Sequence, residues 1–176
     1  HMEILDGNDA FFDPARTLTL VKDVTNDDGG SALAADFTLR LNGGVYTDAA
    51  FTTGATPTVV ANTAYTLSED PLTGYTQTGI ACVDDADQSA VVHPVSLDEG
   101  QSVTCTISND DDAPALTLVK DVTNDDGGRL LAGDFVLRVV GGAYDPSNNA
   151  FSTGAAVVVD SNTPYTIGED DVAGYT

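Results

Sequence analysis

A thirteen-residue stretch occurs twice in this chain without a single difference. It reads LTLVKDVTNDDGG and occupies residues 18–30 and again residues 116–128, 98 positions later. An identity of this length indicates a tandem array of one structural unit. Within the stretch, apolar and β-branched residues alternate with polar ones up to an Asn-Asp-Asp-Gly-Gly turn, a pattern typical of a β-strand. The 176 residues are therefore expected to fold as two β domains of the same kind.

The repeated strand carries a lysine on its apolar side. Every second side chain of a strand shares a face, so one face is predicted to hold Leu18, Leu20, Lys22 and Val24. Because the other residues of this row are aliphatic, the face should be buried. Lys22 and its counterpart Lys120 are the only lysines in the chain. An amine enclosed among apolar side chains needs a partner, or it loses its charge.

The composition narrows the fold class and the partners. Short runs rich in Val, Thr, Ala and Leu are separated by Gly, Asn, Asp and Pro, which predicts an all-β protein. No apolar run approaches the roughly 18 residues of a membrane span, so we expect no membrane insertion in this segment. The net charge of −22 argues against nucleic acid and anionic membranes as partners. It fits a solvated extracellular surface, a saline habitat or calcium binding.

The repeat also sets the expected domain boundaries. Residues 1–15 are interpreted as an N-terminal arm that begins with a cloning remnant. The acidic segment 111–114 is expected to be a short linker, followed by the second unit at residues 115–176. Residues 16–110 are predicted to form a complete β-sandwich, with strands at 17–25, 36–42, 57–61, 63–69, 75–83, 90–96 and 102–109.

The second unit has no counterpart of residues 77–109. Two explanations remain open: a boundary that cuts this repeat, or a strand from another copy that completes it by donor-strand complementation. If the N-terminal arm is extended, Ile4 and Asn8 lie on the same face, as the inward apolar residues and Asn109 do in the last strand of the first unit. This predicts head-to-tail assembly through Lys120 and Asn8. The expected partners are accordingly neighbouring repeats or subunits of the same protein.

Two further polar residues, Glu69 and Asn109, are predicted to face the core of the first unit, each at the end of an inward apolar row. The second repeat retains the lysine and the acid as Lys120 and Glu169. One interpretation is a buried Lys–Glu ion pair capped by an amide hydrogen bond, although such pairs offset their desolvation poorly. The other is an intramolecular isopeptide bond between Lys22 and Asn109, which removes the buried charge.

The chemistry of such a bond suits these residue types. A desolvated lysine amine has a lowered pKa and is nucleophilic. A carboxylic acid in an apolar pocket can stay protonated, polarise the carboxamide and move protons while ammonia leaves. Packing would hold the three groups in contact and exclude water. Lys22, Glu69 and Asn109 are therefore the candidate catalytic residues for a cross-linking reaction that happens only once.

The residues around Glu69 resemble a known motif. The sequence YTLSEDPLTGY at residues 65–75 resembles the E-box of prealbumin-like (Cna B-type, SpaA-type) domains in bacterial pilins and surface adhesins. In that family the first strand supplies a lysine, matched by Lys22, and the last strand supplies an Asn or Asp, matched by Asn109. The resemblance implies that these two residues are bonded and that Glu69 is the assisting acid. The second copy, YTIGEDDVAGY at residues 165–175, departs from the motif because it lacks the proline.

Cys82 and Cys105 both fall on predicted strands of the first unit. An even cysteine count in an acidic, exported protein predicts a disulfide, and two buried free thiols are the alternative. The pair is not part of the family's isopeptide machinery. Metal binding by these cysteines is not expected, since His93 is the only histidine besides His1.

The Asp-rich turns at the end of the repeated stretch have two interpretations. Asp27 and Asp28, and likewise Asp125 and Asp126, could bind calcium, although they lack the spaced ligands and closing glutamate of an EF-hand loop. Asp and Asn also serve simply as turn residues. No cofactor other than calcium is predicted.

The leading functional hypothesis is a structural module. Tandem prealbumin-like sandwiches would serve as a stalk or extender in an adhesin or pilus-like fibre on the bacterial cell surface, resisting force and proteases. A ligand-binding module that recognises a glycan or a host protein is one alternative, and a calcium-stiffened extender domain is another. An enzyme with turnover is not expected, because no Ser-His-Asp, metal or phosphate-cradling set is visible.

Overall fold

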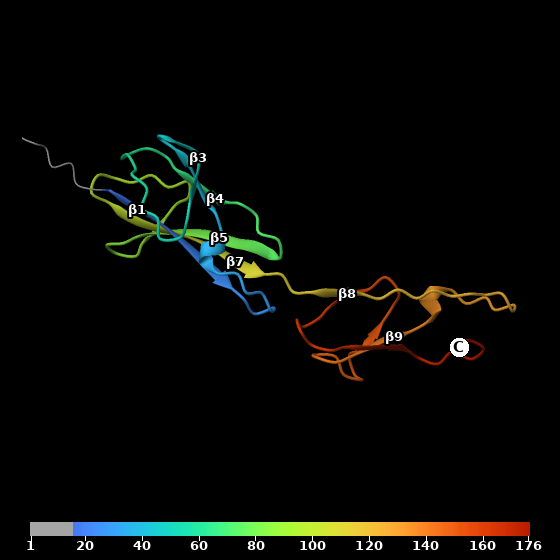
Figure 1. Cartoon of the computed structure of the whole chain (residues 1–176). Helices are drawn as coiled ribbons and strands as arrows, with labels where there is room; N and C mark the ends of the chain where they lie inside the picture. The colour runs from blue at the N-terminus through green and yellow to red at the C-terminus, as the bar shows by residue number, and fades with distance from the viewer. Residues whose placement is uncertain (1–15) are drawn as a thin grey trace, which may run out of the picture. The chain divides into compact units, whose positions relative to one another are not determined.

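The computed structural model describes residues 16–176 (Figure 1), so the predicted donor residues Ile4 and Asn8 lie outside the described part. The chain divides into two compact units. The described part of the first comprises residues 16–25 and 32–110, and the second comprises residues 26–31 and 111–176. Both are built from strands, with only two single-turn 3-10 helices, η1 (Ala34–Asp36) and η2 (Ala132–Asp134), among the described residues. The predicted all-β class is confirmed.

The first unit consists of two sheets. One has the strand order β1-β7-β5-β6 and the other the order β3-β2-β4. The strands of the first sheet are β1 (Thr17–Thr25), β7 (Ser102–Asp111), β5 (Tyr75–Asp84) and β6 (Ala90–Val91). Those of the second are β3 (Tyr46–Phe51), β2 (Leu39–Gly43) and β4 (Thr66–Glu69). The first and last long strands of the unit, β1 and β7, are direct neighbours and run parallel.

The core between these sheets follows the predicted side-chain alternation. Leu18 and Leu20 of β1 are buried, and Lys22 continues their row with 4% of its surface exposed. Strand β7 alternates between buried and partly buried residues along its whole length. The inward residues belong to one apolar cluster, which contains Leu18, Leu20, Leu39, Leu41, Val59, Tyr65, Leu67, Cys82, Val95, Leu97, Val103, Cys105 and Ile107.

The second unit has a three-stranded sheet with the order β10-β9-β12 and a two-stranded sheet that pairs β11 with β8. Its strands are β8 (Ala115–Thr117), β9 (Leu137–Val140), β10 (Ala150–Phe151), β11 (Ala156–Val158) and β12 (Thr166–Glu169). The buried apolar cluster is small and contains Leu118, Leu137, Val139 and Val157. In the first unit, β5 and β7 contribute Cys82, Val103, Cys105 and Ile107 to the core, and the described residues of the second unit include no counterparts of these strands.

The observed strands differ from the predicted ones at several places. No strand forms at residues 57–61, although Val59 is buried there. Strand β3, at residues 46–51, was not expected because its sequence YTDAAF lacks a regular apolar alternation. Strand β7 extends through Asp111, so the first residue of the predicted linker belongs to the strand. None of the helices in the described part is long and apolar enough to cross a membrane.

Candidate functional site: a buried lysine, glutamate and asparagine

The Lys22 amine reaches an amide on the neighbouring strand. The parallel register of β1 and β7 sets Lys22 beside Ile107 and Val24 beside Asn109. Nζ of Lys22 donates a hydrogen bond of 2.5 Å to Oδ1 of Asn109 and one of 3.2 Å to the carbonyl oxygen of Ile107. Asn109 is 2% exposed, so both groups are shielded from solvent. The amine and the carboxamide are thus in direct contact in a dry environment.

Glu69 brings the third group to the same place from the opposite sheet. It ends β4, and its Oε2 atom lies 3.1 Å from Nζ of Lys22. The side chain of Glu69 is 5% exposed and that of Lys22 is fully buried. Among the described residues, Oε2 makes no hydrogen bond of good geometry, so its contact with the lysine is mainly electrostatic. The three residues that sequence analysis predicted to meet do meet.

Burial lowers the pKa of Lys22 below its usual value of 10.5, and the nearby Glu69 carboxylate opposes that shift without cancelling it. The direction follows from the physics, because a low-dielectric environment disfavours the charged ammonium. A lowered pKa increases the fraction of neutral amine, which is the nucleophilic form.

An aromatic ring that the sequence analysis did not single out forms one wall of the site. The Lys22 amine lies 4.4 Å from the centre of the Phe37 ring, and Phe37 is 2% exposed. The second unit repeats the arrangement, with Lys120 at 4.5 Å from the ring of Phe135. Both phenylalanines follow an aspartate at the same repeat position, so comparison of the two repeats would have been the signal that identifies them. The ring excludes water and offers a weak cation–π contact.

The second unit contains the same lysine and acid in an open setting. Nζ of Lys120 lies 2.7 Å from Oε2 of Glu169. The side chains are 18% and 34% exposed, compared with 0% and 5% for Lys22 and Glu69 in the first unit. No asparagine of the described residues takes the place of Asn109 there. The amine and the acid therefore meet without the third group.

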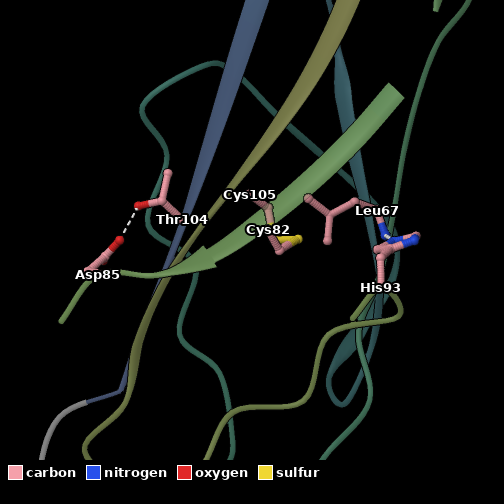
Figure 2. The surroundings of a disulfide bond; sticks show 6 residues. All are labelled: Leu67, Cys82, Asp85, His93, Thr104 and Cys105. Carbon is pink, nitrogen blue, oxygen red and sulfur yellow. Dashed lines mark hydrogen bonds between the residues drawn. A yellow bond between two sulfur atoms is a disulfide. The ribbon is translucent and has the colours of Figure 1, made fainter. Parts of the chain in front are cut away.

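The predicted disulfide is present. Cys82 of β5 and Cys105 of β7 are bonded and buried in the core of the first unit (Figure 2), which excludes the alternative of two free thiols. Leu67 of β4 lies beside them, and its backbone N–H donates a hydrogen bond of 2.8 Å to Nε2 of His93. Since Cys105 precedes Asn109 on the same strand, the disulfide anchors the strand that carries the amide.

The predicted calcium residues fall into two groups. Asp27 and Asp28 lie together with Asp111, with one carboxylate oxygen of each within 4.8 Å of the others. The Asp111 carboxylate already accepts hydrogen bonds from the backbone N–H groups of Asp27 and Asp28 and from that of Gly30. Although burial opposes it, these hydrogen bonds lower the pKa of Asp111. The carboxylate thus organises the turn, a role that the sequence analysis missed. Asp125 and Asp126, at the equivalent positions, are exposed.

Comparison with known proteins assigns the chain to a family. The profile of the prealbumin-like fold domain matches residues 13–107 and again residues 111–176, which together span nearly the whole chain. No curated protein and no solved structure is significantly similar to it. The two matches coincide with the repeat that the sequence shows and with the two sets of sheets. The chain therefore belongs to the prealbumin-like fold domain family and contains two copies of that domain.

Proposed function

We propose that the chain is a structural extender module of a bacterial surface adhesin or pilus-like fibre, and that its first unit closes an isopeptide bond between Lys22 and Asn109. The observation that carries the proposal is the contact of three buried groups, with the amine 2.5 Å from the amide oxygen and 3.1 Å from the acid. Prealbumin-like domains of this type are structural parts of pilins and adhesins, and the disulfide fits an oxidising, extracellular location.

The proposed reaction is an acyl transfer without a cofactor. Neutral Nζ of Lys22 attacks Cγ of Asn109, and the new N–C bond forms as the carbonyl electrons move to Oδ1. The Glu69 carboxyl takes a proton from the attacking nitrogen and delivers one to the amide nitrogen. The C–N bond of the carboxamide then breaks, and ammonia leaves. The product is a secondary amide that joins β1 to β7 and carries no charge.

Such a bond protects the unit against mechanical load. The unit begins with β1 and ends with β7, and these strands are adjacent and parallel. A pull on the two ends of the unit would therefore pass from β1 directly to β7 through the bond. Residues 23–108, including the disulfide, would carry no load, so forced unfolding of the sandwich would be blocked. This property suits an extender that spans distance under force.

Intact mass of the purified chain tests the proposal. Under reducing conditions we expect a deficit of about 17 Da relative to the sequence, from the loss of one ammonia. Lys22→Arg and Asn109→Ala should each restore the full sequence mass. Lys120→Arg is the matched control, because it removes the equivalent lysine of the second repeat and should leave the deficit unchanged. A full sequence mass in the unmodified chain would overturn the proposed bond.

A further inference from the structure

Arg40 links all three strands of the sheet that carries Glu69. It lies on β2, the middle strand of that sheet, and its Nη1 atom donates a hydrogen bond of 3.2 Å to the backbone carbonyl of Asp48 in β3. Its Nε and Nη2 atoms donate hydrogen bonds of 2.9 and 2.5 Å to the two carboxylate oxygens of Asp70. Asp70 directly follows Glu69, the last residue of β4. We refer to the paired side chains of Arg40 and Asp70 as the Arg–Asp clamp.

The backbone connects the clamp to the acid. In the register of β2 and β4, Leu39 lies opposite Glu69. Just beyond this pair, the N–H of Asp70 donates a hydrogen bond of 2.9 Å to the carbonyl oxygen of residue 38. Because Leu39 is fully buried, Arg40 projects from the opposite face of the sheet. Glu69 thus points into the core while the next side chain is held from outside, so the clamp fixes the peptide unit directly after the acid.

The second unit repeats the clamp. Nε and Nη2 of Arg138 donate hydrogen bonds of 2.8 and 2.6 Å to Asp170, and Nη1 donates one of 2.9 Å to Oδ1 of Asn149. The acid before this clamp, Glu169, lies 2.7 Å from the amine of Lys120. The buried apolar cluster is smaller here than in the first unit. The placement of the acid therefore depends on the strands and the clamp that both units share, and not on the size of the surrounding core.

The clamp contributes geometry more than stability. The side chains of Arg40 and Asp70 are 28% and 48% exposed, and ion pairs in such positions stabilise a fold little. Two parallel N–H···O bonds from a guanidinium to a carboxylate nevertheless fix the direction of the contact as well as its distance. These hydrogen bonds lower the pKa of Asp70 and raise that of Arg40, so both side chains stay charged near neutral pH.

We propose that Arg40 and Asp70 are positioning residues that hold the Glu69 carboxyl group at the buried amine while the isopeptide bond forms. They act through the backbone of β4 and not by contact with the reacting atoms. This role rests on the proposed function, but it also has an effect that does not require the bond. The Glu69 carboxylate opposes the burial that lowers the pKa of Lys22, so displacement of the acid lets that pKa fall further.

The rate of cross-linking in the folded chain is the first measurement. The full chain, isolated unfolded from inclusion bodies, is diluted into folding buffer with a glutathione redox couple. Circular dichroism follows folding, and intact mass follows the deficit of about 17 Da. Arg40→Met and Asp70→Asn should each slow the reaction by about 10- to 100-fold, because small displacements of a reacting group are costly. The double variant should be no slower than the slower single variant, since the two side chains act as one unit. Arg138→Met, the same change in the second unit, should leave the rate unchanged.

The titration of the Lys22 amine is the second measurement, made in the Asn109→Ala background where the amine stays free. The chain has only two lysines, so labelling at lysine ¹³Cε gives two resonances to follow by NMR. Arg40→Met should move the Lys22 midpoint to lower pH, in the same direction as Glu69→Gln. Loss of the Arg40 charge alone would move it upward, so a fall reports displacement of the acid. Arg138→Met is again the control and should not move it.

A slower reaction together with a lower Lys22 midpoint supports the positioning role. Unchanged rates in Arg40→Met and Asp70→Asn would overturn it, as would a loss of rate that only follows a loss of folded protein. Additive losses in the double variant would contradict a shared clamp. If the unaltered chain never shows the mass deficit, the proposed function fails. The titration then decides alone whether the clamp places the acid, and an unmoved midpoint overturns the role.

Discussion

Nζ of Lys22 and Oδ1 of Asn109 lie 2.5 Å apart although the two residues are separated by 87 positions in the sequence. The parallel pairing of the first and last strands of the unit makes this contact possible. Its position inside the apolar cluster, between a carboxyl group and an aromatic ring, gives it chemical significance.

Replacing the acid should stop the reaction while leaving the fold intact. Glu69→Gln keeps the shape of the side chain and removes its ability to take a proton. General acid–base catalysis contributes roughly 100- to 10,000-fold, so we expect cross-linking to slow by at least about 100-fold. The measurement is the cross-linked fraction, followed by intact mass from the moment of purification. Glu169→Gln, the same change in the second repeat, serves as control. Equal rates for both variants would contradict the assigned role.

The two lysines should differ in their effect on stability. In the Asn109→Ala background, where no cross-link forms and the amine stays free, Lys22→Ala leaves the buried Glu69 without a positive partner, and breaking a buried pair in this way costs about 3–5 kcal/mol. Lys120→Ala affects a partly exposed pair and should cost less than about 1 kcal/mol. Chemical denaturation followed by circular dichroism measures both. Similar losses for the two variants would show that the burial of Lys22 has no energetic consequence.

Loss of the disulfide should weaken the first unit without preventing the cross-link. A loop closed over a sequence separation of 23 residues stabilises a fold by roughly 3 kcal/mol in the chain-entropy model. We therefore expect the double variant Cys82→Ala, Cys105→Ala to unfold at lower denaturant concentration and still to show the deficit of about 17 Da. An unchanged midpoint would contradict the stabilising role. Loss of the deficit would instead show that the disulfide is needed to position Asn109.

The stability of an uncross-linked variant should rise with pH in the alkaline range. In Asn109→Ala the amine stays free. Because burial lowers the pKa of Lys22 in the folded state, the unfolded chain binds more protons between that lowered value and 10.5, and stability increases with pH across this window. Adding Lys22→Met to the same background should abolish this contribution. The difference between the two denaturation series isolates the lysine, and a flat difference would contradict the lowered pKa.

Calcium removal should leave the thermal midpoint unchanged. The carboxylate of Asp111 accepts three backbone N–H groups, so a cation near Asp27 and Asp28 would have to compete with these hydrogen bonds. We therefore expect the unfolding temperature to be the same in EDTA and in millimolar calcium. A rise in calcium that is lost in Asp111→Asn would instead support the calcium-stiffened alternative.

Much of this site could be predicted from sequence because it depends on which face of its strand each residue occupies, and side chains alternate between the two faces. Alternation along three strands was enough to turn Lys22, Glu69 and Asn109 toward one core, and resemblance to a family supplied their pairing. Phe37 could not be found this way, because a single aromatic residue in an apolar row gives no sign that it lies against a lysine. The Asp111 turn contact was also missed, since it joins a carboxylate to backbone groups that carry no sequence signature.

The repeated stretch shows where sequence reasoning reaches its limit. Residues 18–25 and 116–123 are identical, and the same strand was expected from both. The first is paired along its full length, whereas the second is a strand only as far as Thr117. A strand depends on backbone partners supplied by distant parts of the chain, and local pattern does not record whether those partners exist.

The proposed bond between Lys22 and Asn109 is tested most directly by locating the cross-link itself. The reduced and alkylated chain is digested with proteases, and the fragments are sequenced by tandem mass spectrometry. We expect one branched peptide in which Nζ of Lys22 is joined to Cγ of Asn109, with a mass about 17 Da below the sum of its two arms. Recovery of Lys22 and Asn109 only in separate linear peptides of unaltered mass would contradict it.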